Sequence, residues 1–152
     1  MTIEDKTIEV QKLAVISHKG SMEDMEVLIS QLFGWIEINE VEINGDLFAI
    51  YYTLPDKVPE NEVVYDVGIP IKGEPTGNDL IKVVDMLEHN VLSTIHKGSY
   101  KDIRKSYDAL VEYSLDNNYD IIGSPKEIYM NSPYDVSEEE LLTEIQFPII
   151  KM

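Results

Sequence analysis

The sequence predicts an α+β fold, a tandem pseudo-two-fold repeat of two β-α-β-β units with antiparallel sheets and a ligand cleft between the units. Three observations support this class: a gapless internal repeat, strand-like and helix-like segments in the same order in both copies, and a composition that can fill a core. Apolar residues make up 43% of the 152 residues and aromatics 9%, which is enough for a packed interior. The length fits one domain covering residues 1–152.

The internal repeat is anchored by the tetrapeptide His-Lys-Gly-Ser, which begins at His18 and recurs 78 residues later, beginning at His96. When residues 18–71 are compared with 96–149 without gaps, 17 of 54 positions are identical. A match without gaps means that both copies keep the same element lengths.

The repeat divides the chain into unit one at about 7–72 and unit two at about 81–151, joined by a linker at about 73–80 that contains Gly, Pro and polar residues. Both shared histidines occupy equivalent turn positions, which indicates a structural role at a strand end.

The elements of each unit follow from local patterns. Residues 7–17 and their counterpart at about 85–95 are rich in β-branched residues and are predicted as strands. Apolar residues at helical spacing predict helices over 22–33 and 100–115, capped by Ser21 and Ser99. The remaining predicted strands are 46–54, 63–71, 126–131 and 141–150.

Charge and composition exclude several functional classes. Twelve basic residues against 29 acidic ones leave a net charge of −17, which opposes direct binding to nucleic acids and to anionic membranes. Without cysteine there are no disulfides, thiol nucleophiles or cysteine metal sites. No phosphate-binding or metal-binding motif indicates a cofactor. The start of the chain lacks a secretion signal, and no apolar run could span a bilayer, so we expect a cytoplasmic protein.

Acids on the last strand of each unit are candidates for a binding site. Glu144 alternates with Ile145 and Phe147 and should face the other side of the sheet from them. Asp66 is its counterpart in unit one. A carboxylate among aromatic rings attracts organic cations, although a plain surface acid explains the pattern equally well.

The aromatic residues offer faces for a flat ligand, because the chain has nine Tyr against three Phe. Tyr51 and Tyr129 occupy equivalent strand positions, while Tyr107 and Trp35 lie in the predicted helices. Each of these four could serve core packing or ligand contact. Two repeated units leave a cleft between them, and concave junctions of this kind favour ligands.

The second half carries a recognisable order of motifs: Gly98-Ser99-Tyr100, then Tyr129 to Pro133, then Thr143-Glu144-Ile145 followed by Pro148-Ile149. This order resembles the GyrI-like small-molecule-binding domain. That family covers gyrase-inhibitory proteins and the effector-binding domains of multidrug-responsive bacterial transcription regulators. Its fold is a tandem pair of β-α-β-β units, in agreement with the repeat.

The resemblance implies uptake of hydrophobic, aromatic or cationic molecules, with Glu144 as the pocket acid and Tyr129 and Tyr107 as pocket aromatics. The family commonly has Trp at the position of Tyr107, and Trp35 is a further candidate from unit one. No DNA-binding segment precedes the domain in this sequence. We therefore expect a stand-alone binding protein for sensing or sequestration, linked to transcription regulation or drug resistance.

Two alternatives remain open at this point. Some stand-alone relatives hydrolyse cyclopropane-type compounds, and Glu144 as general base with Tyr129 as hydrogen-bond donor would permit such a hydrolase. The chain could instead be an interaction protein that modulates gyrase or a separate regulator. The ligand, the protein partner and the oligomeric state do not follow from the sequence, and binding is favoured over catalysis.

Overall fold

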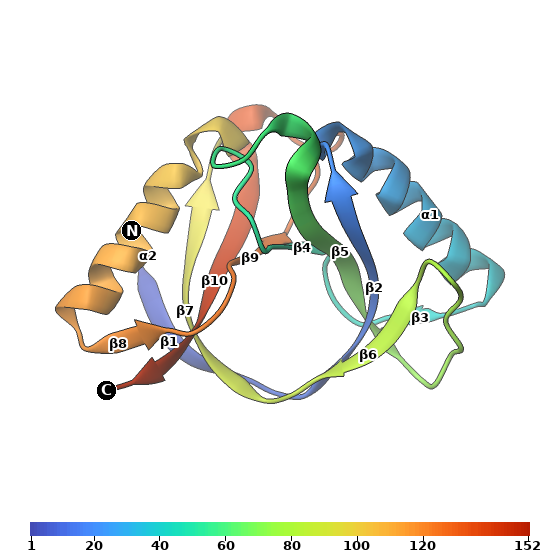
Figure 1. The fold of residues 1–152 in the computed structure, drawn as a ribbon, viewed down its shortest axis with the longest axis horizontal. Coiled ribbons are helices and arrows are strands. Elements are labelled where there is room, and N and C mark those ends of the chain that lie inside the picture. Colours follow the sequence, from blue (N-terminus) through green and yellow to red (C-terminus); the bar gives the residue numbers. More distant parts are fainter. The chain divides into compact units, whose positions relative to one another are not determined.

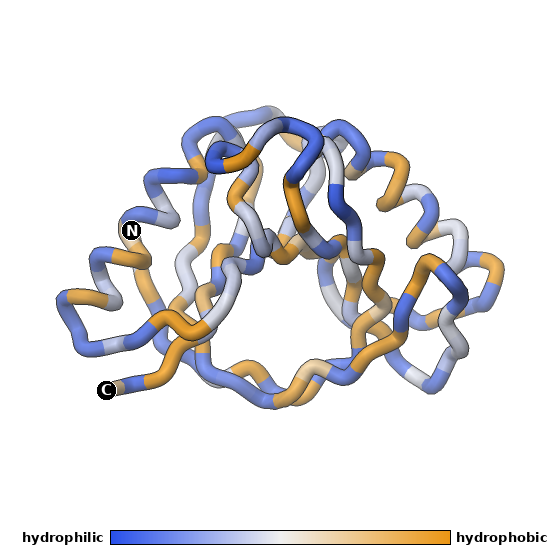
Figure 2. Tube along the Cα trace, viewed as in Figure 1, coloured by the Kyte–Doolittle hydropathy of each residue, from blue (hydrophilic) through white to orange (hydrophobic).

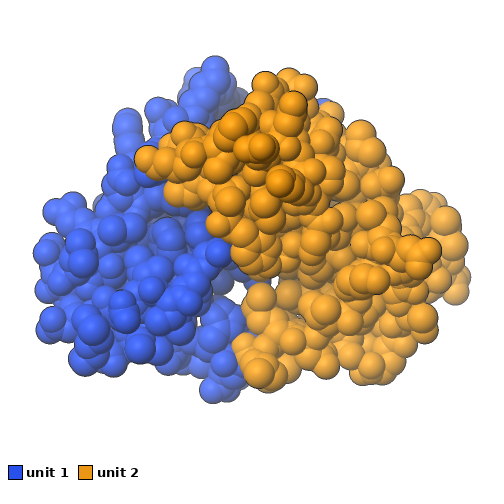
Figure 3. Space-filling model, viewed as in Figure 1, with its two compact units in different colours: residues 1–9, 88–152 blue, residues 10–87 orange.

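The computed structural model describes all 152 residues, and they form two compact units (Figures 1 and 3). Unit 1 contains residues 1–9 and 88–152, and unit 2 contains residues 10–87. Each unit consists of one antiparallel sheet and one α-helix. The predicted α+β class with antiparallel sheets is confirmed.

Unit 1 has the strand order β1-β7-β10-β9, in which every neighbouring pair is antiparallel. Helix α2 (Arg104–Asp116) packs against β7 and β10, and it covers one face of this sheet in Figure 1. A short strand, β8 (Tyr119–Ile121), pairs with the end of β10. The four main strands are β1 (Ile3–Ile8), β7 (His89–Lys97), β9 (Lys126–Tyr129) and β10 (Leu142–Lys151).

Unit 2 has the corresponding order β6-β2-β5-β4, again antiparallel throughout. Helix α1 (Met25–Ile38) packs against β2 and β5, and the short strand β3 (Glu42–Ile43) pairs with β5. The four main strands are β2 (Gln11–Gly20), β4 (Phe48–Tyr51), β5 (Val63–Lys72) and β6 (Lys82–Met86).

The segment predicted as one strand over 7–17 is in fact the end of β1 and most of β2. The break falls at Glu9 and Val10, both exposed, where the chain leaves the sheet of unit 1 and enters that of unit 2. The counterpart predicted at about 85–95 likewise divides between β6 and β7. The compact units therefore have different bounds from the sequence repeats. Most of the first repeat lies in unit 2 of the structure, and most of the second repeat lies in unit 1. The short strands β3 and β8 were not predicted.

Serine caps precede both helices, as the sequence predicts. Ser21 Oγ accepts a hydrogen bond from the Glu23 backbone N–H at 3.1 Å, and Ser99 Oγ accepts one from the Lys101 N–H at 3.1 Å. Each cap opens a short 3-10 turn that leads into the α-helix. These bonds satisfy backbone donors that have no partner inside a helix.

The helices are amphipathic, and Figure 2 shows hydrophobic and hydrophilic residues alternating along both of them. The apolar stripe of α1 is buried through Leu28, Leu32, Trp35 and Ile36. The buried stripe of α2 is more polar and contains Ser106, Tyr107, Leu110 and Ser114. Neither helix is long and apolar enough to cross a membrane.

Candidate functional site

Glu144 lies on the face of the unit 1 sheet that points away from helix α2. In the β10 ladder it stands opposite Ile95 on β7 and Ile128 on β9, so these three side chains share one face. Phe147, which has the other parity, packs its ring against Tyr107 of α2 at a centroid distance of 5.8 Å. The alternation along β10 therefore separates the acid from the helix.

The Glu144 carboxylate is held by three donors that all reach Oε2. Lys6 Nζ lies at 2.7 Å, Ser93 Oγ at 2.8 Å and Gln146 Nε2 at 2.8 Å. Burial has the largest single effect on the pKa of Glu144 and raises it, but the bonds from Gln146, Lys6 and Ser93 together outweigh it and hold the pKa below its usual value. The side chain is 15% exposed, so this is an ionised carboxylate in a partly buried position.

A second ammonium group lies on the same face. Lys126 stands directly opposite Gln146 in the ladder between β9 and β10 and is buried. Its burial lowers the pKa of the Lys126 amine to about 8, although the negative charge of Glu144 acts in the opposite direction. The polar cluster on this face thus combines Glu144 with two lysines, Ser93 and Gln146.

A different acid, Glu127, lies under helix α2 on the other face of the sheet. It is 8% exposed, and both of its carboxylate oxygens accept hydrogen bonds from tyrosines. Tyr107 of α2 donates to Oε2, and Tyr129 donates to Oε1 at 3.1 Å. The structure thereby brings together two of the predicted aromatics, Tyr107 and Tyr129, around an acid that was not among the predicted site residues.

The negative charge of Glu127 is costly at this position because the side chain is buried. Burial raises the pKa of Glu127, and the two tyrosine bonds and the nearby His96 only partly offset this effect. His96 is itself buried beneath α2, and its Nε2 donates to the Ser99 carbonyl at 2.9 Å while Nδ1 lies 3.0 Å from Ser106 Oγ. Both ring nitrogens therefore serve structural bonds, in line with a role at the strand end.

Alternation along β9 could have revealed Glu127. It precedes Tyr129 by two residues, so the two side chains must share a strand face. Its ladder partner Ile145 is a core residue. The equivalent position in unit 2 is Ala49, an apolar residue, and an acid at a core-facing position is the signal that the sequence carried.

The predicted site residues of unit 2 make their contacts with other residues of unit 2. Tyr51 packs against Tyr65 with ring centroids 6.0 Å apart, and Trp35 is buried on α1. Asp66 accepts a 2.6 Å bond from the Tyr52 hydroxyl. In unit 2, therefore, the counterpart of Glu144 is held by a neutral donor.

A comparison with models of protein families shows which family the chain belongs to. The model of the GyrI-like small-molecule-binding domain matches residues 1–150. The chain belongs to this family. The resemblance seen in the sequence is thus confirmed over nearly the whole chain.

Solved structures show the same fold at low sequence identity. The C-terminal domain of EcmrR matches this GyrI-like domain with a TM-score of 0.88 and 20% identity, over 99% of this chain and 98% of the other. In a cryo-EM structure of the EcmrR–DNA complex the TM-score is 0.87 at 20% identity, over 99% of this chain but only 58% of the EcmrR chain. The fold of this chain therefore matches one part of the longer EcmrR chain.

More distant relatives extend the comparison. An uncharacterized conserved protein from Listeria innocua has a TM-score of 0.77 and 11% identity, over 97% of this chain and 92% of the other. SAV2435, solved with bound tetraphenylphosphonium, has a TM-score of 0.61 and 12% identity, over 99% of this chain and 94% of the other. No curated protein sequence matches the chain.

Tyr129 and Glu144 of this GyrI-like domain leave opposite faces of the unit 1 sheet. Tyr129 stands opposite Thr143 in the ladder, whereas Glu144 stands opposite Ile128. A reaction that needs both groups on one substrate atom does not fit this arrangement. No group of three or more His, Asp or Glu side chains is placed to hold a metal ion.

Proposed function

We propose that the chain binds hydrophobic, aromatic or cationic small molecules for sensing or sequestration, linked to transcription regulation or drug resistance. The observation that carries the proposal is Glu144, an ionised and partly exposed carboxylate in a domain of a small-molecule-binding family. Its ladder partner Ile95 is 50% exposed on the same face. Apolar surface beside a carboxylate suits an organic molecule with a polar or charged group.

The aromatic residues would supply flat apolar faces. Tyr129, Tyr107, Tyr51 and Trp35 are proposed as ligand contacts, and Asp66 is proposed as the weaker acid of the second unit. Because Tyr129 and Tyr107 lie on the side of the sheet that faces α2, they would contact a ligand on that side and not the group bound at Glu144. The Glu127 carboxylate would orient Tyr107 and Tyr129 through their hydroxyls. We propose binding ahead of hydrolysis because Glu144 and Tyr129 lie on opposite faces of the sheet.

Tetraphenylphosphonium is a suitable first probe, since the related SAV2435 was solved with it. Isothermal calorimetry would compare the wild type with Glu144→Gln and with Glu139→Gln, a control on an exposed turn. Loss of the carboxylate removes attraction for the cation and should weaken binding about tenfold, roughly 1.4 kcal/mol.

The control variant should bind like the wild type, because an exposed and screened charge contributes little. Circular dichroism checks that both variants are folded. Equal affinities of Glu144→Gln and the wild type would exclude Glu144 from the site. An absence of binding for this and other lipophilic compounds would reject the proposed function.

We propose a separate regulator or gyrase as the protein partner through which the chain is linked to transcription. The net charge of −17 opposes direct contact with DNA. Co-purification with gyrase or with a purified regulator tests this part of the proposal, and separate elution of the proteins with ligand present would count against it.

A further inference from the structure

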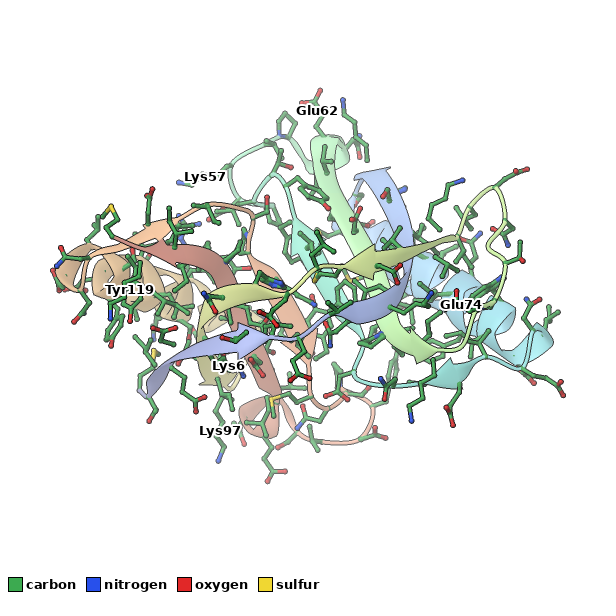
Figure 4. The ribbon with its side chains drawn as sticks, turned by 90° about the horizontal axis from the view of Figure 1, so that it is seen from below. Lys6, Lys57, Glu62, Glu74, Lys97 and Tyr119 are labelled. Carbon is green, nitrogen blue, oxygen red and sulfur yellow. The ribbon has the colours of Figure 1, made fainter.

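Glu144 already has a cation beside it in the folded protein. Lys6 Nζ lies 2.7 Å from Glu144 Oε2, and the lysine side chain is 36% exposed. Lys6 comes from strand β1, at the edge of the unit 1 sheet, where Figure 4 labels it. Strand β7 lies between β1 and β10, so the apolar stem of Lys6 crosses β7 to bring its ammonium to the carboxylate.

The internal repeat indicates that the fold does not require a lysine here. The position equivalent to Lys6 in unit 2 is Val84 on β6, which stands opposite Leu13 on β2 as Lys6 stands opposite Val91 on β7. The same edge-strand position thus accepts an apolar side chain. In unit 2 the equivalent acid Asp66 is held by a neutral tyrosine hydroxyl, so the ion pair is a property of unit 1.

We infer that Lys6 is a built-in competitor for cations at Glu144, so that the site discriminates against permanent cations and favours neutral aromatic compounds with a hydrogen-bond donor. This inference rests on the proposed binding function and assigns the specificity of the same site. A ligand cation and Lys6 require the same carboxylate, and opposing an unwanted ligand with a like charge is a general route to specificity.

A neutral hydrogen-bond donor can bind to Glu144 without displacing Lys6. All three internal bonds end on Glu144 Oε2, so a ligand O–H or N–H can bond to Oε1 while Lys6 stays in place. A permanent cation must either displace Lys6 or approach it against like-charge repulsion. The buried Lys126 on the same face adds to this repulsion whenever it is protonated.

The test compares two probes of similar shape, tetraphenylphosphonium as the cation and triphenylmethanol as the neutral donor. Their affinities are measured by calorimetry for the wild type, Lys6→Met, Lys6→Arg and Lys105→Met. Methionine keeps the length of the apolar stem and removes the charge, whereas arginine keeps the charge. Lys105, exposed on α2, controls for the change in net charge alone.

Lys6→Met should bind tetraphenylphosphonium about tenfold more tightly than the wild type, with less than about a twofold change for triphenylmethanol. Lys6→Arg and Lys105→Met should both keep the ratio of the two affinities close to that of the wild type. A carbon-13 NMR titration of the Glu144 carboxyl gives a readout without ligand. Its pKa should rise in Lys6→Met because a stabilising positive charge is lost.

Two results separate failure of the inference from failure of the proposed function. If both probes bind and Lys6→Met leaves their affinity ratio unchanged, the competitor role of Lys6 is refuted while the binding function stands. If neither probe binds any variant, the proposed function and the inference fall together. An unchanged Glu144 pKa in Lys6→Met would also overturn the inference, because the ion pair would then not exist in solution.

Discussion

Replacing Tyr107 by Phe removes one hydroxyl from the interior of unit 1 and leaves its ring against Phe147. The hydroxyl donates to Glu127 Oε2, and Glu127 is buried, so water cannot take its place without a rearrangement. In the variant, Tyr129 is the remaining tyrosine that donates to this carboxylate. The substitution therefore tests whether the Glu127 cluster stabilises unit 1.

The expected loss follows from the charge and burial of the acceptor. A hydrogen bond to a charged group contributes about 1.5–3 kcal/mol, and a buried acceptor left unsatisfied costs a similar amount. Because Tyr129 still donates, we expect Tyr107→Phe to lower the free energy of unfolding by about 2 kcal/mol at pH 7. For a chain of this size, that change corresponds to a fall in Tm of about 4–8 °C.

The pH dependence separates this effect from a simple packing defect. Burial already raises the pKa of Glu127 in the folded state, and loss of a donor raises it further. A folded-state pKa above the unfolded one means that the folded protein binds the proton more tightly. Stability is then lost as the pH rises from the unfolded pKa through the folded one. The destabilisation by Tyr107→Phe should therefore grow between about pH 4.5 and neutral pH.

The assay is urea unfolding followed by circular dichroism at several pH values, with Tyr113→Phe as the matched control. Tyr113 lies on the same helix and stacks on Tyr119 through its ring, which phenylalanine retains. The control should change stability by less than about 0.5 kcal/mol. Equal losses in the two variants, or a loss in Tyr107→Phe that does not vary with pH, would refute this account of Glu127.

Other substitutions address the same cluster and the packing of unit 2. Glu127→Gln removes the titrating group, so its unfolding free energy should fall less than that of the wild type as the pH rises above about 4.5, as measured by urea unfolding. Gly68→Ala would place a Cβ 2.6 Å from the Phe48 ring and 2.8 Å from the Ala14 carbonyl oxygen, and should cost about 2 kcal/mol in the same assay. Gly34→Ala inside α1 meets no atom within 4 Å and should add about 0.5–1 kcal/mol by restricting the unfolded chain. A destabilised Gly34→Ala or an unaffected Gly68→Ala would contradict these packing arguments.

The elements that the sequence predicts well are those with a strong local signal. Helical spacing locates α1 and α2, and the serine caps mark where each 3-10 turn begins. The gapless repeat transfers each strand of one half to the other. The sequence carries no such signal for the pairing of β1 with unit 1 and of β6 with unit 2. The β-branched composition continues across Glu9 and Val10, where β1 ends and β2 follows. The partner of a strand is set by tertiary structure, because the same local sequence could form a strand in either sheet.

In the candidate site, too, the sequence predicts which face of a strand a side chain lies on but not which distant residue it meets. Alternation along β10 identifies Glu144 as the acid opposite the core side, and the same argument applied to β9 would have found Glu127. Lys6 could not have been found in this way, because its approach to Glu144 depends on the pairing of β1 with β7. Residues from distant parts of the chain meet only through that pairing, for which local sequence gives no rule.

Two acids of unit 1 differ in their chemistry because neighbouring strands expose them to opposite surroundings. Glu127 faces helix α2, where burial outweighs two tyrosine donors and raises its pKa. Glu144 faces away from α2, where a lysine, a serine and an amide outweigh burial and lower its pKa. The first acid suits a structural role that fixes Tyr107 and Tyr129, since its charge is costly and inaccessible. The second keeps its charge and some exposure, so ligand recognition by this face depends on how firmly Lys6 holds Glu144.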